Sequence, residues 1–198
     1  VCSSDLTHQG GFPDRDVPSS AWHDHAQVRQ AVCDFSLQWP PGSRIQYHGL
    51  SAHWVLAMVI EAVTGQDFRA YITDTILRPL GLENDLFVGL PEAQQSRMTY
   101  LYEPAATELK QQLRDESTST TWQRAGEPGG GAYGTARGMV ALYQMMLQGG
   151  RLNGVQLVSP RTLAYAIQNH TGDRVDEFMG MPMHRGLGPH LQIGRAHV

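Results

Sequence analysis

The chain has 198 residues, of which 41% are apolar and 17% charged, and its formal net charge is −4. This composition is typical of a globular domain with a sizeable core and excludes a disordered chain. It gives no electrostatic reason to expect binding to nucleic acid or to an anionic membrane. No apolar run approaches the roughly 20 residues that span a bilayer, so we predict no membrane span.

Both ends of the chain look foreign to the rest. Residues 1–6 and residues 193–198 each match a common short-read sequencing adapter translated in frame. We therefore expect the biological segment to be residues 7–192, a partial domain truncated at both ends. Only Cys33 then remains of the two cysteines. A lone thiol is typical of a small buried residue rather than of a disulfide framework or a nucleophile.

The first predicted helix covers residues 21–35, where apolar residues such as Val28 and Phe35 recur on a helical period. It contains His23 and His25, which can bind a metal from a strand or loop but face different sides of a helix. No third ligand follows at a metal-site spacing, so we favour a solvated surface and assign no metal. A site made of His23, His25 and another histidine is the alternative.

The stretch from 39 to 82 organises the rest of the chain. Residues 40–43 predict a turn because of their Pro and Gly content, and residues 44–47 can then be extended. Residues 51–63 are apolar on nearly every side, which predicts a buried helix. Gly65 has the position of a C-cap glycine that stops this helix.

A second helix follows, with Asp67 as its N-cap and Pro79 at its end. Short strands are predicted at residues 86–88 and 98–102, where β-prone residues gather. Residues 103–124 are polar and weakly patterned. We interpret them as a surface excursion that includes a Ser/Thr-rich loop at its end.

Three consecutive glycines at 129–131 allow a close backbone approach, but no Gly-Lys-Ser/Thr follows, so they are not a phosphate loop. Thr135 is the predicted N-cap of the next helix. Its apolar stripe, which predicts core packing, consists of Met139, Leu142, Tyr143, Met146 and Leu147.

The last part of the chain contains a predicted tight turn at 152–155 and a helix that begins at Ser159 with Pro160 in its first turn. This helix is expected to run to about residue 170. Residues 185–191 resemble the start of a strand. No internal repeat or linker divides the chain.

Several short motifs carry the strongest functional signal. In chain order they are Leu6-Thr7-His8-Gln9-Gly10-Gly11-Phe12-Pro13, Pro41-Gly42-Ser43-x-x-x-Tyr47, Glu61-Ala62-Val63-Thr64-Gly65, Arg78-Pro79-Leu80-Gly81-Leu82, Gly130-Gly131-x-x-Gly134-Thr135-Ala136-Arg137-Gly138-Met139, Leu147-x-Gly149-Gly150 and Leu157-x-Ser159-Pro160. Each motif is weak alone. The ordered set resembles the serine β-lactamase-related family, the group of class C β-lactamases, D-alanyl-D-alanine carboxypeptidases and esterases.

The resemblance implies an α+β, β-lactamase/transpeptidase-like fold. Such a fold pairs an antiparallel sheet flanked by helices with an all-helical lobe, and the active site lies between them. In a truncated domain, the loss of part of the sheet would leave apolar faces uncovered.

The family's Tyr-x-Asn element maps to Tyr47, His48 and Gly49. An isolated tyrosine is usually structural, but one whose pKa is lowered by neighbouring lysines can serve as general base for a serine. The resemblance therefore implies that role for Tyr47, with Phe12 and Pro13 as further neighbours of the substrate site. Gly49 replaces the asparagine that holds a substrate amide in some members, which favours an esterase-like branch over β-lactam turnover.

The other catalytic motifs of the family are missing from the sequence. No serine is followed three residues later by a lysine, and Lys110 is the single lysine. We expect the Ser-x-x-Lys motif upstream of residue 7 and the Lys/His-x-Gly motif downstream of residue 191. The parent protein would then cleave a small-molecule ester or amide through an acyl-serine intermediate without a cofactor, and the fragment alone would be inactive. The alternative is a non-catalytic binding or regulatory module on the same scaffold.

Overall fold

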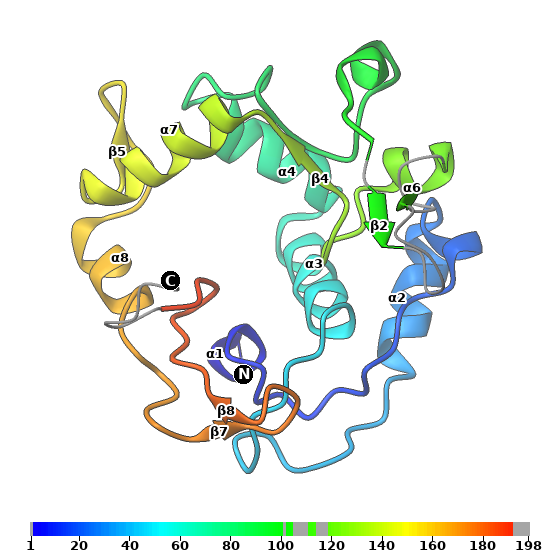
Figure 1. Cartoon of the computed structure of the whole chain (residues 1–198), viewed down its shortest axis with the longest axis vertical. Coiled ribbons are helices and arrows are strands. Elements are labelled where there is room, and N and C mark those ends of the chain that lie inside the picture. Colours follow the sequence, from blue (N-terminus) through cyan, green and yellow to red (C-terminus); the bar gives the residue numbers. More distant parts are fainter. Residues whose placement is uncertain (1, 101, 105–110, 114–118, 192–198) are drawn as a thin grey trace.

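The computed structural model describes residues 2–100, 102–104, 111–113 and 119–191. Its helices are α1 (Cys2–Leu6), α2 (His25–Cys33), α3 (Ser51–Thr64), α4 (Phe68–Ile72), α6 (Thr120–Ala125), α7 (Ala136–Leu147) and α8 (Pro160–Ala166), with the further helical segments η1 (Ser19–Ala21), η2 (Thr73–Leu77) and η3 (Glu92–Arg97). In Figure 1 the elements follow one another around a ring, from α2 and α3 through α4 and α7 to α8. None of the described helices has the length and apolar character needed to cross a membrane.

The described strands are short and form four antiparallel pairs. They are β1 (Leu86–Val88) with β4 (Ala132–Gly134), β2 (Tyr102–Pro104) with β3 (Gln111–Leu113), β5 (Arg151–Leu152) with β6 (Val155–Gln156), and β7 (Val175–Asp176) with β8 (Met181–Pro182). The β1–β4 pair joins segments far apart in the chain, with Phe87 opposite Tyr133. The predicted strand at 86–88 and the predicted turn at 152–155 are therefore confirmed.

Side-chain caps fix the starts of α4, α7 and α8. The Asp67 carboxylate accepts hydrogen bonds from the backbone N–H groups at 69 and 70, at 2.8 and 3.0 Å. Thr135 and Ser159 cap α7 and α8 in the same way, each accepting from an N–H three residues later at 3.0 Å. Gly65 ends α3 in the left-handed conformation, with φ +70°. All four predictions are confirmed, because these bonds are local and satisfy backbone groups that every helix end leaves unpaired.

Helix α2 is shorter than predicted. It begins at His25 because the carboxylate of Asp24 accepts from the N–H groups of Ala26 and Gln27 and acts as the N-cap. It ends at Cys33, which is exposed as a free thiol. The prediction that this cysteine is buried is therefore wrong.

Helix α3 is buried on one side only, so the prediction of an all-round buried helix is wrong. Trp54 is fully buried and Ala57 is nearly so, whereas Val59 is 39% and Val63 80% exposed. The helices α1, α2 and α4 contact α3 and supply the covered side. The core around it consists of Val17, Ala21, Trp22, Val28, Trp54, Ala57, Phe68 and Ala125.

A second apolar cluster lies where η2 meets α7 and β5. Its buried members are Leu77, Leu80, Leu82, Leu86, Met145 and Leu152. Leu142 and Met146 pack against it, but Met139, Tyr143 and Leu147 are exposed. The predicted core stripe of α7 is thus wrong for these three residues, because this cluster covers the opposite side of the helix.

The region from 98 to 125 differs most from prediction. The predicted strand at 98–102 does not form over Met98, Thr99 and Tyr100, and Leu101 lies outside the described residues. Strand β2 begins at Tyr102 and pairs with β3 inside the stretch that was predicted to be irregular. Helix α6 begins within the predicted Ser/Thr-rich loop because the Ser119 hydroxyl caps it; positions 117 and 118 lie outside the described residues.

Helix α8 stops at Ala166, four residues before its predicted end. The side chain of Asn169 accepts from the N–H groups of Thr171 and Gly172, and this local turn competes with continuation of the helix. The strand predicted at 185–191 is reduced to a single bridge between Arg185 and His190.

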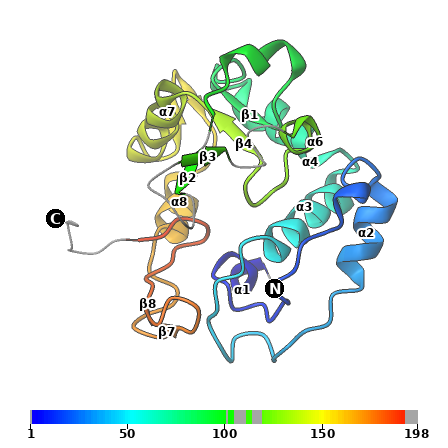
Figure 2. The ribbon, with the colours of Figure 1, turned by 45° about the vertical axis from the view of Figure 1, so that its right-hand side comes forward.

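The C-terminal part returns to the N-terminal half of the chain, as Figure 1 and Figure 2 both show for β7 and β8. The N–H of Glu177 donates to the carbonyl of Ile45 at 2.8 Å. The Arg174 guanidinium donates to Gln9 Oε1 at 2.6 Å and to the Gly42 carbonyl at 3.0 Å. These contacts place the hairpin directly against the segment that carries Tyr47.

We expect Trp54→Ala to lower the free energy of unfolding by about 3–5 kcal/mol, because it removes a fully buried aromatic side chain. It also removes the indole N–H that donates to Asp16 Oδ1 at 2.8 Å. Urea unfolding followed by circular dichroism measures the change. Val63→Ala, at an 80% exposed position of the same helix, is the control and should change stability by no more than about 0.5 kcal/mol. Equal losses in the two variants would contradict the one-sided burial of α3.

Candidate active site

Tyr47 is held by its backbone to a buried carboxylate. Its N–H donates to Asp176 Oδ1 at 3.1 Å, across 129 positions of sequence. The same oxygen accepts from the N–H groups of Phe178 and Met179 at 3.0 and 3.2 Å. Asp176 is fully buried, and its other oxygen pairs with Arg185 at 2.8 Å.

The electrostatics of Asp176 follow from these contacts. Burial by itself raises the pKa of the carboxyl. The Arg185 guanidinium and the N–H groups of Tyr47 and Met179 outweigh this effect and hold the pKa below its ordinary value. The carboxylate is therefore charged at neutral pH and can anchor the hairpin to the tyrosine segment.

The half-buried Tyr47 ring has neighbours on several sides. The His8 ring lies 4.7 Å away between centroids and is tilted by 54°. The Phe178 ring lies at 5.9 Å, and the Arg185 guanidinium carbon at 5.3 Å from the centroid. Arg185 is the positively charged residue among these neighbours, and its guanidinium is already paired with Asp176.

His8 was not predicted as a site residue. It is 7% exposed and has φ +57°, a left-handed conformation that residues other than glycine rarely adopt. Burial, followed by the charge of Arg185, lowers its pKa to about 3, so its imidazole is neutral at physiological pH. The signal that could have found it was its place in the Thr-His-x-x-Gly motif. For Asp176 and Arg185 the sequence holds no local signal.

His48 faces the interior instead of the solvent. It is 1% exposed, its Nδ1 lies 2.7 Å from the Gln46 carbonyl, and burial lowers its pKa. Its ring packs edge-on against His8 at 5.2 Å and lies 6.5 Å from Phe12. Pro13 is half-buried beside Phe12. The structure thus brings Phe12 and His48 together, and His48 contacts His8, which itself packs against Tyr47.

Gly49 leaves room next to the tyrosine hydroxyl. A Cβ at this position would lie 3.6 Å from the Tyr47 hydroxyl oxygen, which is ordinary contact. The glycine loop, residues 129–131, passes close to Gly49: a Cβ at Gly129 would come within 2.3 Å of the Gly49 carbonyl oxygen. The close backbone approach expected of residues 129–131 is therefore observed, and its partner is the Tyr47 segment.

A cavity of about 720 Å³ includes Leu50, which lies three residues after Tyr47, in its lining. Its volume is in the range of small-molecule sites. The lining residues come from β1, η3, α6 and β4 as well as from the start of α3, and most are apolar: Leu50, Phe87, Leu90, Gln94, Arg97, Met98, Thr99, Trp122, Gly130, Ala132, Tyr133, Gly134 and Thr135. This cavity forms only where these separate segments meet, so no local pattern in the sequence marks it.

Glu127 is a buried carboxyl at the base of the glycine loop. It is 1% exposed, and its Oε1 accepts from the Gly129 N–H at 2.7 Å. Oε2 has no hydrogen-bond partner among the described residues. Burial, reinforced by the nearby charge of Asp16, raises the pKa of Glu127 to about 7.

Comparison with known proteins identifies the family. Residues 6–194 match the Beta-lactamase family model. The chain is 31% identical over 183 residues to a protein of Escherichia coli O157:H7 provisionally named D-alanyl-D-alanine carboxypeptidase, and 30% identical to its counterpart in strain K12. Each alignment covers 80% of this chain and 41% of the relative. The chain therefore belongs to the Beta-lactamase family, a family of serine hydrolases.

Solved structures confirm the predicted β-lactamase/transpeptidase-like fold. A family VIII carboxylesterase superposes with a TM-score of 0.78 at 23% identity, covering 97% of this chain and 55% of that one. A penicillin-binding protein homologue from Caulobacter crescentus gives 0.76 at 22% identity, covering 96% and 54%. The D-amino acid amidase of Ochrobactrum anthropi gives 0.66 at 20%, covering 96% and 53%. The chain thus spans about half the length of the proteins that it matches.

We expect Glu127→Gln to remove a pH dependence of stability. The folded carboxyl keeps its proton up to about pH 7, whereas an ordinary glutamate releases it near 4.5. The folded state therefore binds more protons within this window, and the free energy of unfolding falls as pH rises through it. Glutamine keeps the acceptor for Gly129 but cannot ionise. The variant should match the wild type near pH 4 and exceed its stability by up to about 3 kcal/mol at pH 8.

Urea unfolding over a pH series measures this difference. Glu92→Gln, which removes a carboxylate from an exposed pair with Arg124, is the control and should follow the wild-type profile closely. Parallel pH profiles for the Glu127 variant and the wild type would show that the buried carboxyl does not hold its proton.

Proposed function

We propose that the protein carrying this chain is a serine hydrolase that cleaves a small-molecule ester or amide, with Tyr47 as its general base. Residues 7–192 then form part of the hydrolase domain. The observation that carries the proposal is the way Tyr47 is held: its backbone is bound to buried Asp176 and its ring packs against His8. A tyrosine held in a defined position is what proton transfer at one defined atom requires.

The proposed reaction has two steps. Tyr47 in its phenolate form takes the proton from a serine hydroxyl while the serine oxygen attacks the carbonyl carbon, and backbone N–H donors stabilise the resulting oxyanion. The intermediate collapses, and the proton on Tyr47 passes to the leaving alcohol or amine. Water then cleaves the acyl-serine through the same groups. No cofactor takes part in these steps.

The proposed serine is supplied by sequence outside these 198 residues. Two facts support this part of the proposal. The chain contains no Ser-x-x-Lys, because Lys110 is its single lysine and Thr107 lies three residues before it. The chain also spans only 41% of the carboxypeptidase relatives that it matches.

An esterase-like substrate is favoured over a β-lactam. Gly49 lies beside the Tyr47 hydroxyl and has no side-chain amide with which to hold a substrate amide. The cavity at Leu50 is lined mostly by apolar residues, which suits an apolar acyl group.

The second candidate is a non-catalytic binding or regulatory module on the same scaffold. The absence of Ser-x-x-Lys from the chain is the observation in its favour. The native sequence that precedes residue 7 distinguishes the two functions: a Ser-x-x-Lys within about twenty residues of it supports the hydrolase.

In the whole protein, we expect Tyr47→Phe to lower kcat/KM for a nitrophenyl ester by about 100- to 10,000-fold, because the change removes the general base. The fold should persist, since the contacts with Asp176 are made by the backbone. Tyr165→Phe, at a 54% exposed position, is the matched control and should retain wild-type turnover. Wild-type kinetics in the Tyr47 variant would refute the assigned role.

The 198-residue chain alone is expected to show no burst of nitrophenol release with the same ester, because it lacks the nucleophile and its lysine. Stopped-flow absorbance at equal protein concentrations, with the whole protein as positive control, measures the burst. A stoichiometric burst from the chain alone would mean that another residue acts as nucleophile.

A further inference from the structure

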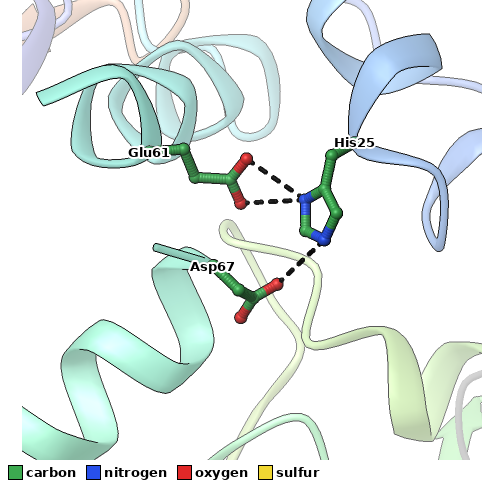
Figure 3. Close-up of side chains that lie close together, drawn as sticks. All are labelled: His25, Glu61 and Asp67. Carbon is green, nitrogen blue, oxygen red and sulfur yellow. Dashed lines mark hydrogen bonds and ion pairs between the residues drawn. The ribbon is translucent and has the colours of Figure 1, made fainter. Parts of the chain in front are cut away.

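One charged cluster lies outside the candidate active site. It consists of His25, the first residue of α2, Glu61 in the last part of α3, and Asp67, the N-cap of α4. Figure 3 shows the imidazole between the two carboxylates. Nδ1 lies 3.1 Å from both oxygens of Glu61, and Nε2 lies 3.5 Å from Asp67 Oδ2.

The two carboxylates are oriented by further bonds. Glu61 Oε1 accepts from the Phe68 N–H at 3.2 Å. Asp67 Oδ1 accepts from two N–H groups of α4, and Oδ2 pairs with Arg69 at 2.7 Å. Burial would raise the pKa of Asp67, but these bonds and the Arg69 charge lower it below its ordinary value. These bonds orient the carboxylates of Glu61 and Asp67 before any ion binds. Hydrogen bonds from neighbouring groups orient the ligands of a metal site in the same way.

The charges of the cluster favour a cation. Arg69 compensates Asp67, and it is also held by the carbonyl oxygens of Trp22 and Ala125. Within the described part of the chain, His25 is the sole ion-pair partner of Glu61. The cluster thus has two carboxylates and one arginine, which is paired with Asp67 and not with Glu61.

The spacing suits a transition metal. One ligand atom from each residue can be chosen so that all three lie within 4.8 Å of one another. Ligand atoms around a tetrahedral zinc at 2.0–2.2 Å are about 3.3–3.6 Å apart, so the distances between the ligand atoms must shorten by at most about 1.5 Å. The His25 side chain is 55% exposed and has room to rotate. An imidazole with two carboxylates favours Zn²⁺ over Mg²⁺ or Ca²⁺, which prefer oxygen ligands alone.

We propose that His25, Glu61 and Asp67 bind one zinc-type divalent ion that fastens α2 to the corner between α3 and α4. Water completes the coordination on the exposed side. Because each ligand comes from a different helix, the ion restrains these three elements relative to one another. The proposal is independent of the hydrolase function, since it needs neither Tyr47 nor a nucleophile.

The test is zinc binding by isothermal titration calorimetry on chain stripped with EDTA. Cys2 and Cys33 are replaced by Ser in every sample, because a thiol such as the exposed Cys33 is itself a zinc ligand. We expect one zinc per chain and a higher unfolding temperature when zinc is present. With Co²⁺ as the probe, visible absorption bands should report an imidazole and carboxylate environment.

The decisive variants are His25→Ala and Glu61→Gln. Each should weaken zinc binding by at least about tenfold and abolish the thermal shift, since each removes a ligand or its charge. Glu61→Gln keeps the acceptor for Phe68, so its fold should persist, and circular dichroism checks this. His23→Ala, at an exposed histidine two positions from His25, is the matched control and should bind as the parent does.

Two results would overturn the proposal. One is the absence of stoichiometric binding by the parent chain. The other is binding that His25→Ala and Glu61→Gln leave unchanged, or that His23→Ala weakens as much as they do, because the ion would then sit elsewhere.

Discussion

The arrangement around Tyr47 depends on one buried carboxylate. Burying a charge costs free energy unless it is paired and hydrogen-bonded, and Asp176 meets both conditions through Arg185 and three backbone N–H groups. Two of those groups belong to its own turn and the third to Tyr47. The C-terminal hairpin and the tyrosine segment therefore form one unit, and a residue near the end of the chain sets the position of the proposed base.

The histidines near this unit provide packing contacts rather than charge. They are His8, His48 and His53, whose ring lies 6.1 Å from that of His8 between centroids. Burial lowers the pKa of all three, so they are neutral at pH 7. The Arg185 charge is taken up by Asp176. The described surroundings of Tyr47 thus fix its orientation but add no free positive charge. This division of tasks agrees with the proposal that the nucleophile and its lysine come from elsewhere in the protein.

Local interactions were predictable from the sequence and distant ones were not. The caps at Asp67, Thr135 and Ser159 bridge two or three residues, so residue type and spacing sufficed to find them. The covered face of α3 could not be read from a helix apolar on nearly all sides, because its partners decide which side is buried. The family and its fold followed from the order of motifs. The contact of Asp176 with Tyr47 required the folded chain.

The cluster at His25 was not predictable from the sequence for the same reason: its members are distant in the chain and meet only when it folds. The histidine next to His25 in sequence is His23, whereas the neighbours of His25 in space are Glu61 and Asp67. Helix α3 connects this cluster to the proposed active site: Glu61 lies ten residues along it from Ser51, or about 15 Å at 1.5 Å per residue. An ion bound there would be too far away to touch a substrate at Tyr47. Its effect would be to hold the far end of the helix whose N-cap residue, Leu50, lines the cavity.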